Sequence, residues 1–347
     1  KETPMKDLSW GILGTAGIAR KAMLPALRDA EGCRLAAIAS RDVARAEAMA
    51  GEFGIPRAYG SYEALLADPE IDVIYNPLPN HLHVPLTLQA LAAGKHVLCE
   101  KPLALSLAEA REVTAAAQAA GRVVAEAFMT RHHPQWIRAR ELVSAGRIGR
   151  LTGVQALFSY CNDDPQNVRN QKDIGGGGLY DVGCYAVDTA RFFFGDEPEA
   201  VSCTMDLDPD FGTDRLTTGA ARFTGGGQLS FTVSTQSALV QQLTLLGTEG
   251  YLVLDAPFNC PADHAARLAL DSGTDLLGGG RELLTCPPAD QYRLQAESFA
   301  RAVHQNHFAA GAAADILGNA ATLEALTRAA QSRRWEAITS TTGQAGD

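Results

Sequence analysis

Two stretches of the sequence carry side chains that could move a proton. Lys101 stands between Glu100 and Pro102, directly after an apolar run, while Asp181 and Tyr185 stand four residues apart behind a run of glycines. Hydride transfer from a carbinol requires that the hydroxyl proton leave, so such a site needs an acid or base near the reacting oxygen. A lysine serves when burial and a cationic neighbour lower its pKa. Lys101, Tyr185 and Asp181 are therefore the candidate catalytic residues.

The glycine run at residues 175–178 opens a predicted helix that extends to residue 194. Glycines permit a ligand to approach the backbone closely, and a helix that starts at Gly178 places Asp181 and Tyr185 on one face. The alternative is a helix that packs on a sheet with an incidental tyrosine. Gln236 ends a predicted strand, where it could reach the substrate or be solvent-exposed. The candidate substrate contacts are Lys101, Arg169, Asp181, Tyr185 and Gln236.

A nucleotide-binding turn is expected near the N-terminus. A predicted strand at residues 10–13 runs into Gly14-Thr15-Ala16-Gly17-Ile18-Ala19, which matches the dinucleotide pattern G-x-G-x-x-G/A except that Ala16 replaces the second glycine. The helix that follows would hold a pyrophosphate at its N-terminus. The alternative is an ordinary glycine-containing turn between a strand and a helix.

The end of the second predicted strand indicates which dinucleotide is bound. Ser40 and Arg41 stand where an acidic residue would hold the ribose hydroxyls of NAD, and a hydroxyl followed by an arginine can bind a 2′-phosphate instead. The expected cofactor is therefore NADP, with NAD the less favoured choice. Arg41 could also be a solvated surface charge. Asp42 is expected to cap the helix at residues 43–53.

Other candidate cofactor contacts follow the later strands. The turn at residues 77–83 is expected to cap a helix and touch the cofactor, and its two histidines are not expected to bind a metal because no third ligand stands near. The candidate cofactor contacts are Gly14, Thr15, Ala16, Ile18, Ala19, Arg20, Ser40, Arg41, Tyr59, Leu78, Asn80, His83, Glu100, Lys101 and Arg169.

The elements that must position these residues fall into two groups. Residues 9–128 alternate between short apolar runs and amphipathic helical stretches, which predicts a doubly wound parallel sheet. The expected strands are residues 10–13, 34–40, 73–76, 96–99 and 122–125. Longer strands linked by glycine-rich turns follow, at residues 151–160, 200–206, 215–224, 227–235, 241–247 and 250–255, and predict an antiparallel sheet. Helices are expected at residues 291–304 and 313–330, whereas residues 263–290 resist assignment.

Length and charge limit the function classes. The 347 residues suggest roughly two domains, which we place at residues 1–128 for the cofactor and 129–347 for substrate binding and oligomerisation. The net charge of -10 argues against nucleic acid, and no apolar run reaches the roughly 18 residues of a membrane span. Seven scattered cysteines and the lack of an apolar signal core in residues 1–8 lead us to expect the cytoplasm.

The order Gly14–Ala19, Glu100-Lys101-Pro102 and residues 175–185 resembles the Gfo/Idh/MocA oxidoreductases over nearly the whole chain. The resemblance implies a Rossmann domain followed by an α+β domain with an open, mostly antiparallel sheet, and it makes Lys101 catalytic. Tyr185 stands where inositol dehydrogenase-like members carry histidine. The chain thus looks like the branch of NADP-dependent D-xylose dehydrogenase, dimeric dihydrodiol dehydrogenase, glucose-fructose oxidoreductase and the sugar 3-ketoreductases, in which this tyrosine is the proposed acid or base.

The expected function is hydride transfer between NADP and a carbinol or ketone carbon of a sugar-like substrate, as in an aldose dehydrogenase or a ketosugar reductase. Whether Lys101 or Tyr185 carries the proton stays open. The alternatives are a trans-dihydrodiol dehydrogenase and a non-catalytic regulator that senses NADP and a sugar. The open sheet should present an apolar face, so a homodimer or homotetramer formed through that sheet is expected.

Overall fold

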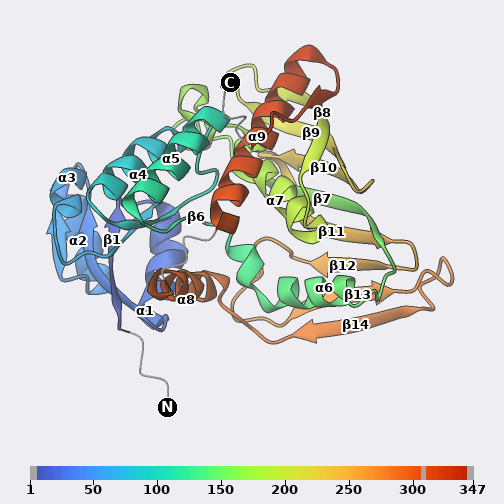
Figure 1. The fold of residues 1–347 in the computed structure, drawn as a ribbon, viewed down its shortest axis with the longest axis horizontal. Helices are drawn as coiled ribbons and strands as arrows, with labels where there is room; N and C mark the ends of the chain where they lie inside the picture. The colour runs from blue at the N-terminus through green and yellow to red at the C-terminus, as the bar shows by residue number, and fades with distance from the viewer. Residues whose placement is uncertain (1–5, 306–309, 342–347) are drawn as a thin grey trace. The chain divides into compact units, whose positions relative to one another are not determined.

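The computed structural model describes residues 6–305 and 310–341, which divide into two compact units. The first unit comprises the chain up to residue 129 together with residues 290–317, and the second comprises residues 130–289 and the chain from residue 318. Both expected sheets are present, one in each unit (Figure 1). The expected fold class is confirmed.

The first unit contains a six-stranded parallel sheet in the order β3-β2-β1-β4-β5-β6. In this doubly wound order, β2 and β3 are added on one side of β1 and β4 to β6 on the other, and such folds bind ligands at this switch point between β1 and β4. The five predicted strands are present, and β3 was missed because it has only three half-buried residues. The strands are β1 (Leu8–Leu13), β2 (Cys33–Ala39), β3 (Arg57–Tyr59), β4 (Val73–Asn76), β5 (His96–Cys99) and β6 (Val124–Glu126).

Side-chain caps fix where the helices of this unit begin. Asp42 Oδ1 accepts a hydrogen bond from the Ala44 amide at 3.0 Å, as expected, and Ser61 and Ser106 cap their helices in the same way. The helical elements are η1 (Ala19–Met23), α1 (Leu24–Asp29), α2 (Val43–Phe53), α3 (Tyr62–Leu66), η2 (Asn80–Leu82), α4 (His83–Ala92) and α5 (Leu107–Ala120).

Helix α8 (Gln291–His304) belongs to the first unit, although the division at residue 128 assigned it to the second domain. Its apolar face closes the core beside β1, where the Phe299 and Trp10 ring centroids lie 5.5 Å apart and Ala296 and Ala300 are fully buried. The reason is that the buried face of β1 needs this late segment to exclude water from Trp10.

The second unit contains a nine-stranded sheet in the order β14-β13-β12-β11-β7-β10-β9-β8-β15. All neighbours pair antiparallel except β7 and β10. The segment that resisted assignment contains β13 and β14. The strands are β7 (Leu151–Cys161), β8 (Pro198–Leu207), β9 (Asp214–Phe223), β10 (Gln228–Ser234), β11 (Gln236–Gly247), β12 (Tyr251–Asp255), β13 (Ala266–Asp271), β14 (Arg281–Cys286) and β15 (Glu336–Ala337).

One face of this sheet is covered by helices α6 (Pro134–Ser144) and α7 (Cys184–Phe194). Helix α9 (Ala310–Ser332) is the last helix, and short helical turns occur at η3 (Met129–His132), η4 (Val168–Asn170), η5 (Lys172–Ile174) and η6 (Leu179–Gly183). The predicted helix at residues 178–194 is thus confirmed as η6 followed by α7.

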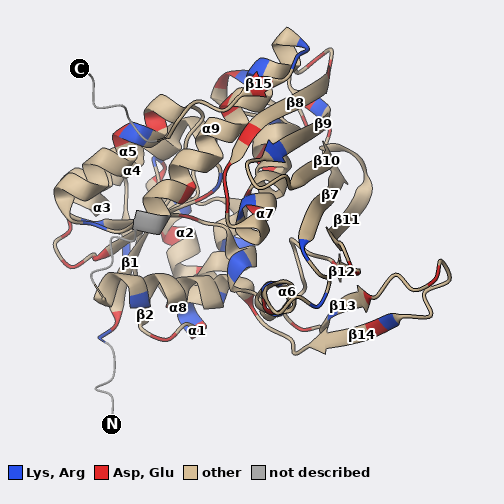
Figure 2. Ribbon diagram, turned by 45° about the vertical axis from the view of Figure 1, so that its right-hand side comes forward, with Lys and Arg blue, Asp and Glu red and all other residues tan. Residues whose placement is uncertain are grey.

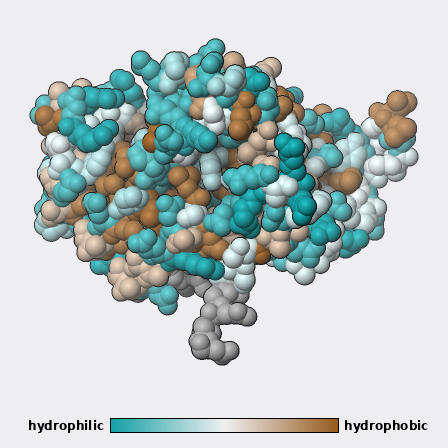
Figure 3. Space-filling model, turned by 90° about the horizontal axis from the view of Figure 1, so that it is seen from above, coloured by the Kyte–Doolittle hydropathy of each residue, from teal (hydrophilic) through white to brown (hydrophobic). Residues whose placement is uncertain are grey.

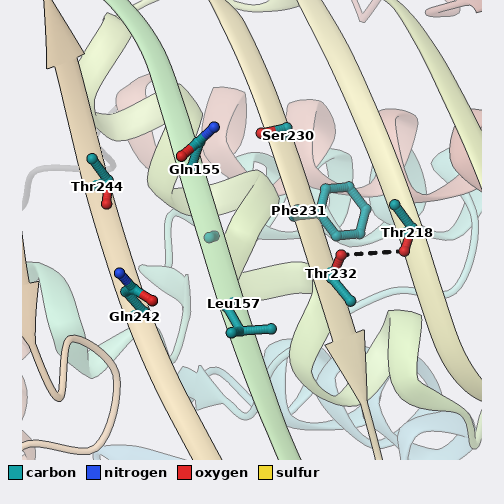
Figure 4. A pocket seen from close by; sticks show the side chains of 9 residues that line it. Gln155, Leu157, Thr218, Ser230, Phe231, Thr232, Gln242 and Thr244 are labelled. Atoms are coloured by element: carbon teal, nitrogen blue, oxygen red, sulfur yellow. Dashed lines mark hydrogen bonds between the residues drawn. The ribbon is translucent and has the colours of Figure 1, made fainter.

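The other face of the sheet is more polar than expected. A shallow hollow of about 300 Å³ on it is lined by Gln155, Thr218, Ser230, Thr232, Gln242 and Thr244, with Leu157 among them (Figure 4). Leu216 of β9 and Leu246 of β11, on opposite sides of this hollow, are half-exposed. Threonine combines a branched carbon that suits a strand with a polar group that suits water, so the face is mixed and not apolar.

The rest of the surface is also mixed. The face seen in Figure 3 carries both hydrophobic and hydrophilic side chains, and acidic and basic residues are interspersed along the ribbon in Figure 2. Within the described ranges, no helix is long and apolar enough to cross a bilayer, and no three His, Cys, Asp or Glu side chains are grouped to hold a metal.

Candidate active site

The turn after β1 requires glycine at its first position. Gly14 has a φ of +78°, and a Cβ there would lie 2.7 Å from Leu78 Cδ2. Its amide donates to the Ala39 carbonyl at 2.7 Å, which joins the turn to β2. Only glycine adopts this conformation without strain and without a clash. Leu78 therefore contributes to the site by packing against this turn at Gly14.

The helix after this turn begins without a side-chain cap. It starts near Gly17, which is exposed and has no atom within 4 Å of the position a Cβ would take, and no side chain accepts from its first amides. Open space beside an uncapped helix start is what a dinucleotide pyrophosphate needs. The neighbours of Gly17 in the turn differ in burial: Thr15, Ala16 and Ile18 are half-buried, and Ala19 is fully buried.

Two arginines near this turn have different surroundings. Arg20 is paired with Glu52 of α2 at 2.5 Å, so its guanidinium is engaged within the protein. Arg41 is exposed, and in the described part of the chain it makes no ion pair. Next to it, buried Ser40 accepts from the Asp42 amide at 3.2 Å. Arg41 and not Arg20 therefore presents an available positive charge beside the end of β2.

Two other candidate cofactor contacts are engaged inside the first unit. The Tyr59 hydroxyl donates to Asp68 at 2.8 Å, and burial together with this carboxylate raises the pKa of the phenol. His83 is 1% exposed, and its Nε2 and Nδ1 lie 2.6 Å from the Leu78 carbonyl and 2.8 Å from the Pro102 carbonyl. Burial lowers the pKa of this imidazole to about 4. Any effect of His83 on a cofactor is therefore indirect, whereas Asn80 lies half-buried at the start of η2.

Lys101 is held at the carboxyl edge of the parallel sheet. The amide of Glu100 donates to the Asn76 carbonyl at 3.0 Å, and Glu100 Oε1 accepts from the Tyr75 hydroxyl at 2.6 Å. On the other side, Glu126 accepts from the Leu103 amide at 2.8 Å. Tyr75 and Glu126 were not among the predicted site residues, although each is a polar residue in a mostly apolar strand.

In the second unit, Asp181 is held by two side chains. Arg169 Nε lies 2.9 Å from Asp181 Oδ1, and the Tyr160 hydroxyl donates to Asp181 Oδ2. The negative charge of Asp181 raises the pKa of Arg169, and burial followed by this charge raises the pKa of Tyr160. The structure thus brings together Asp181 and Arg169, which the sequence singled out, with Tyr160, which it missed. Asp181 is consequently a fixed acceptor.

Tyr185 follows on the next turn and is fixed by aromatic packing. Its ring centroid lies 5.7 Å from that of Phe158 and 5.5 Å from that of Phe258, and the residue is 5% exposed. Asp181 lies in η6, a π-helical turn of a kind that is frequent at functional sites, and Tyr185 lies in α7. The two side chains are therefore presented from one rigid segment.

The glycine run packs closely against other parts of the second unit. Gly177 has a φ of +117°, and a Cβ there would lie 2.0 Å from Asp214 Oδ1. A Cβ on Gly176 would lie 2.5 Å from the Arg169 carbonyl. Asp214 Oδ2 accepts from the Leu179 amide at 2.7 Å and thereby caps the helix. Gly176 and Gly177 thus permit close packing within the protein, and the expected approach of a ligand to this run stays a prediction.

Gln236 is likewise engaged within the second unit. Its Nε2 donates to Asp208 Oδ2 at 2.9 Å, while Asp208 also accepts from the amides of Asp210 and Phe211. Gln236 therefore ties the start of β11 to the loop between β8 and β9.

Comparisons with known proteins agree with this arrangement. The family model of the Gfo/Idh/MocA oxidoreductase family with an NAD-binding Rossmann fold matches residues 8–128, and that of the Gfo/Idh/MocA C-terminal domain matches residues 136–253. The chain is 45% identical over 334 residues to an uncharacterized oxidoreductase, ORF334, of Rhizobium meliloti, covering 96% of this chain and 100% of the relative.

Two named enzymes extend the comparison. D-xylose 1-dehydrogenase (NADP(+)) 2 of Haloferax volcanii is 43% identical, covering 85% of this chain and 89% of that protein. The solved structure of KijD10, a 3-ketoreductase from Actinomadura kijaniata in complex with NADP and TDP-benzene, has a TM-score of 0.88 at 29% identity and covers 93% of this chain and 98% of that one.

Proposed function

The chain belongs to the Gfo/Idh/MocA oxidoreductase family, and from that premise we propose that it transfers a hydride between NADP and a carbinol or ketone carbon of a sugar or sugar-like substrate. The observation that carries this proposal is the fixed Glu100-Lys101 turn in a unit that also has an uncapped helix start. Relatives named as a D-xylose dehydrogenase and a sugar 3-ketoreductase support the substrate class.

The cofactor site is proposed to lie along the carboxyl ends of β1, β2 and β4. Gly14 forms the turn, Gly17 leaves room for the pyrophosphate beside the helix amides, and Ser40 and Arg41 would bind the 2′-phosphate of NADP. NADP, when bound, supplies the nicotinamide that accepts or donates the hydride. An acidic protein thus would hold an anionic cofactor through local groups, since its net charge of -10 is repulsive.

The proton is proposed to pass to a side chain of this protein. Oxidation of a carbinol removes a hydride from carbon and a proton from oxygen, and Lys101 Nζ and Tyr185 Oη are the two candidate acceptors. Asp181, whose two oxygens are held by Arg169 and Tyr160, would orient the substrate or the phenol. In the reverse direction, the same group returns the proton to the carbonyl oxygen.

We propose a homodimer or homotetramer that uses the outer face of the nine-stranded sheet. Helices α6 and α7 cover the opposite face of the sheet and leave this one uncovered by them. Its mixed surface of threonine, glutamine and leucine is compatible with an interface.

A cytoplasmic location is supported by the seven cysteines, none of which forms a disulfide in the described residues.

The test is a panel of substrates followed by the absorbance of reduced nicotinamide. Aldoses and trans-dihydrodiols are mixed with protein and NADP⁺, and ketosugars with protein and NADPH. We expect turnover with an aldose or a ketosugar. Turnover confined to dihydrodiols would favour the activity named for the mouse relative, which is 37% identical over 70% of this chain. Tight NADPH binding with no turnover would contradict the proposal and favour a regulator.

A further inference from the structure

Buried polar side chains flank Lys101 on both sides within the first unit. Tyr75, which has no exposed surface, donates its hydroxyl to Glu100 Oε1 at 2.6 Å. His83, 1% exposed, lies with Nδ1 2.8 Å from the Pro102 carbonyl. The residue before Lys101 is therefore bonded to a buried phenol, and the residue after it lies within hydrogen-bond distance of a buried imidazole, whose neutral form donates to either the Pro102 or the Leu78 carbonyl.

Further bonds extend this support to neighbouring elements. Glu100 is also bonded to β4 through the Asn76 carbonyl, and Leu103 is bonded to Glu126 at the end of β6. His83 begins α4, and its Nε2 lies 2.6 Å from the Leu78 carbonyl. Leu78 is the residue whose side chain packs against Gly14. Residues 100–103 are thus connected to β4, α4 and β6 at once.

Packing alone does not explain these polar atoms. A phenylalanine at position 75 would fill the same space as the tyrosine ring, and a buried hydroxyl costs free energy unless it is hydrogen-bonded. Burial and the charge of Glu100 raise the pKa of Tyr75 well above its usual value, so the phenol stays a donor at any working pH. A protonated phenol against a carboxylate fixes the orientation of Glu100 beside Lys101.

We propose that Tyr75 and His83 are positioning residues that hold the Glu100-Lys101-Pro102 turn, and through it the Lys101 amine, in the geometry required for proton transfer. The contacts of Tyr75 with Glu100 and of His83 with the Pro102 carbonyl form a clamp on this turn. This inference rests on the proposed function, since it takes the purpose of the clamp to be the placement of Lys101. Tyr75 acts through Glu100, and His83 acts through the Pro102 carbonyl. Neither residue needs to touch substrate or cofactor.

The sharpest test is Tyr75→Phe, which removes one hydroxyl and keeps the ring. A small misplacement of a reacting group costs about 100-fold in rate, so we expect kcat to fall by about 10- to 100-fold with the substrate KM and the NADPH Kd unchanged. The matched control is Tyr251→Phe, which removes a hydroxyl that donates to Asp271 at 3.1 Å in the second unit. It should leave kcat unchanged.

A second readout does not depend on turnover. The six lysines are reductively methylated with ¹³C, and the Lys101 signal is identified by its loss in Lys101→Met. We expect Tyr75→Phe to move this signal and Tyr251→Phe to leave it in place. His83→Gln should also move it if the variant folds, and Tyr75→Phe suffices if it does not.

The outcomes separate this inference from the proposed function. An unchanged kcat or an unmoved Lys101 signal in Tyr75→Phe would overturn the clamp. If Lys101→Met keeps its full kcat, the proposed role of Lys101 fails whatever Tyr75 does. If Lys101→Met is inactive while Tyr75→Phe is fully active, only the clamp fails.

Discussion

Two helices of this protein begin behind glycines, and the two starts are built for opposite purposes. The helix after Gly14 begins without a side-chain cap, and the space beside Gly17 is open. The helix after residues 175–178 begins against Asp214, which caps the Leu179 amide and fills the space beside Gly177. Both starts continue into a π-helical turn, η1 in one unit and η6 in the other. One start can receive an external anion, whereas the other already has an internal one.

The difference shows that glycine before a helix does not by itself indicate a ligand site. A helix start is open to a ligand only where the protein supplies no acceptor of its own for the first amides. In the second unit that acceptor is Asp214, which stands 35 residues beyond Leu179 and so gives no local signal in the sequence. In the second unit the glycines instead let the Arg169 loop pack against the helix start, which places Arg169 beside Asp181. Under the proposed function, the first region would bind the pyrophosphate of NADP, and the second would hold Asp181 so that it orients the substrate or the Tyr185 phenol.

The largest effect is expected at Gly177. Alanine there would adopt a φ of +117° and would overlap Asp214, so Gly177→Ala should lower the free energy of unfolding by roughly 3 kcal/mol or more. Gly17→Ala is the matched change at the open start, where it should alter stability by less than about 1 kcal/mol. Urea unfolding measures both. Equal losses would remove the distinction between the two starts.

Acid should weaken the first unit more than the second. Burial lowers the pKa of His83 to about 4 in the folded protein, against about 6.5 in an unfolded chain, so the unfolded state binds more protons in this window and stability falls as the pH drops through it. From pH 7 to pH 5 the loss from this group is about 2 kcal/mol. Burial raises the pKa of Asp214, so this group favours the folded second unit as the pH falls.

Urea unfolding of wild type and His83→Gln at both pH values checks the acid effect. The variant should lose less stability on acidification than the wild type does. If both lose the same amount, the acid response originates elsewhere in the first unit, where burial also lowers the pKa of His96 to about 4.

A smaller effect is expected at Arg41, which tests whether the open start belongs to an NADP site. Arg41→Ala should weaken NADPH binding about tenfold, or about 1.4 kcal/mol, and leave NADH binding unchanged, because only NADPH carries the 2′-phosphate. The control is Arg45→Ala, which removes a different exposed arginine that lies on α2. Fluorescence titration with both nucleotides distinguishes the variants. Equal losses for NADPH and NADH would show that Arg41 does not read the phosphate.

The sequence predicted the elements whose signals are local. Apolar runs located five of the six parallel strands, and Asp42 caps the helix that it was expected to cap. The three residues of β3 are too few for a periodic signal. Strands β13 and β14 were missed because they flank a glycine-rich hairpin in which the pattern is broken.

The candidate site was predictable by residue type but not by partner. Lys101, Asp181 and Tyr185 could be singled out because their chemistry and motifs stand in the sequence, and their roles stay predictions. Tyr75 and Tyr160 donate to Glu100 and Asp181 across 25 and 21 residues of sequence. Such pairs depend on strand register and on which strand lies next to which, and a single sequence does not specify either.

Replacement of Lys101 tests most directly whether the first unit supplies chemistry as well as a nucleotide site. The measurement is single-turnover hydride transfer by wild type and Lys101→Met, with the NADPH Kd determined on the same samples. We predict that hydride transfer falls by about 100-fold or more while the Kd stays within about twofold, because a general acid or base contributes 100-fold or more to such a step. Unchanged hydride transfer in Lys101→Met would contradict the assignment.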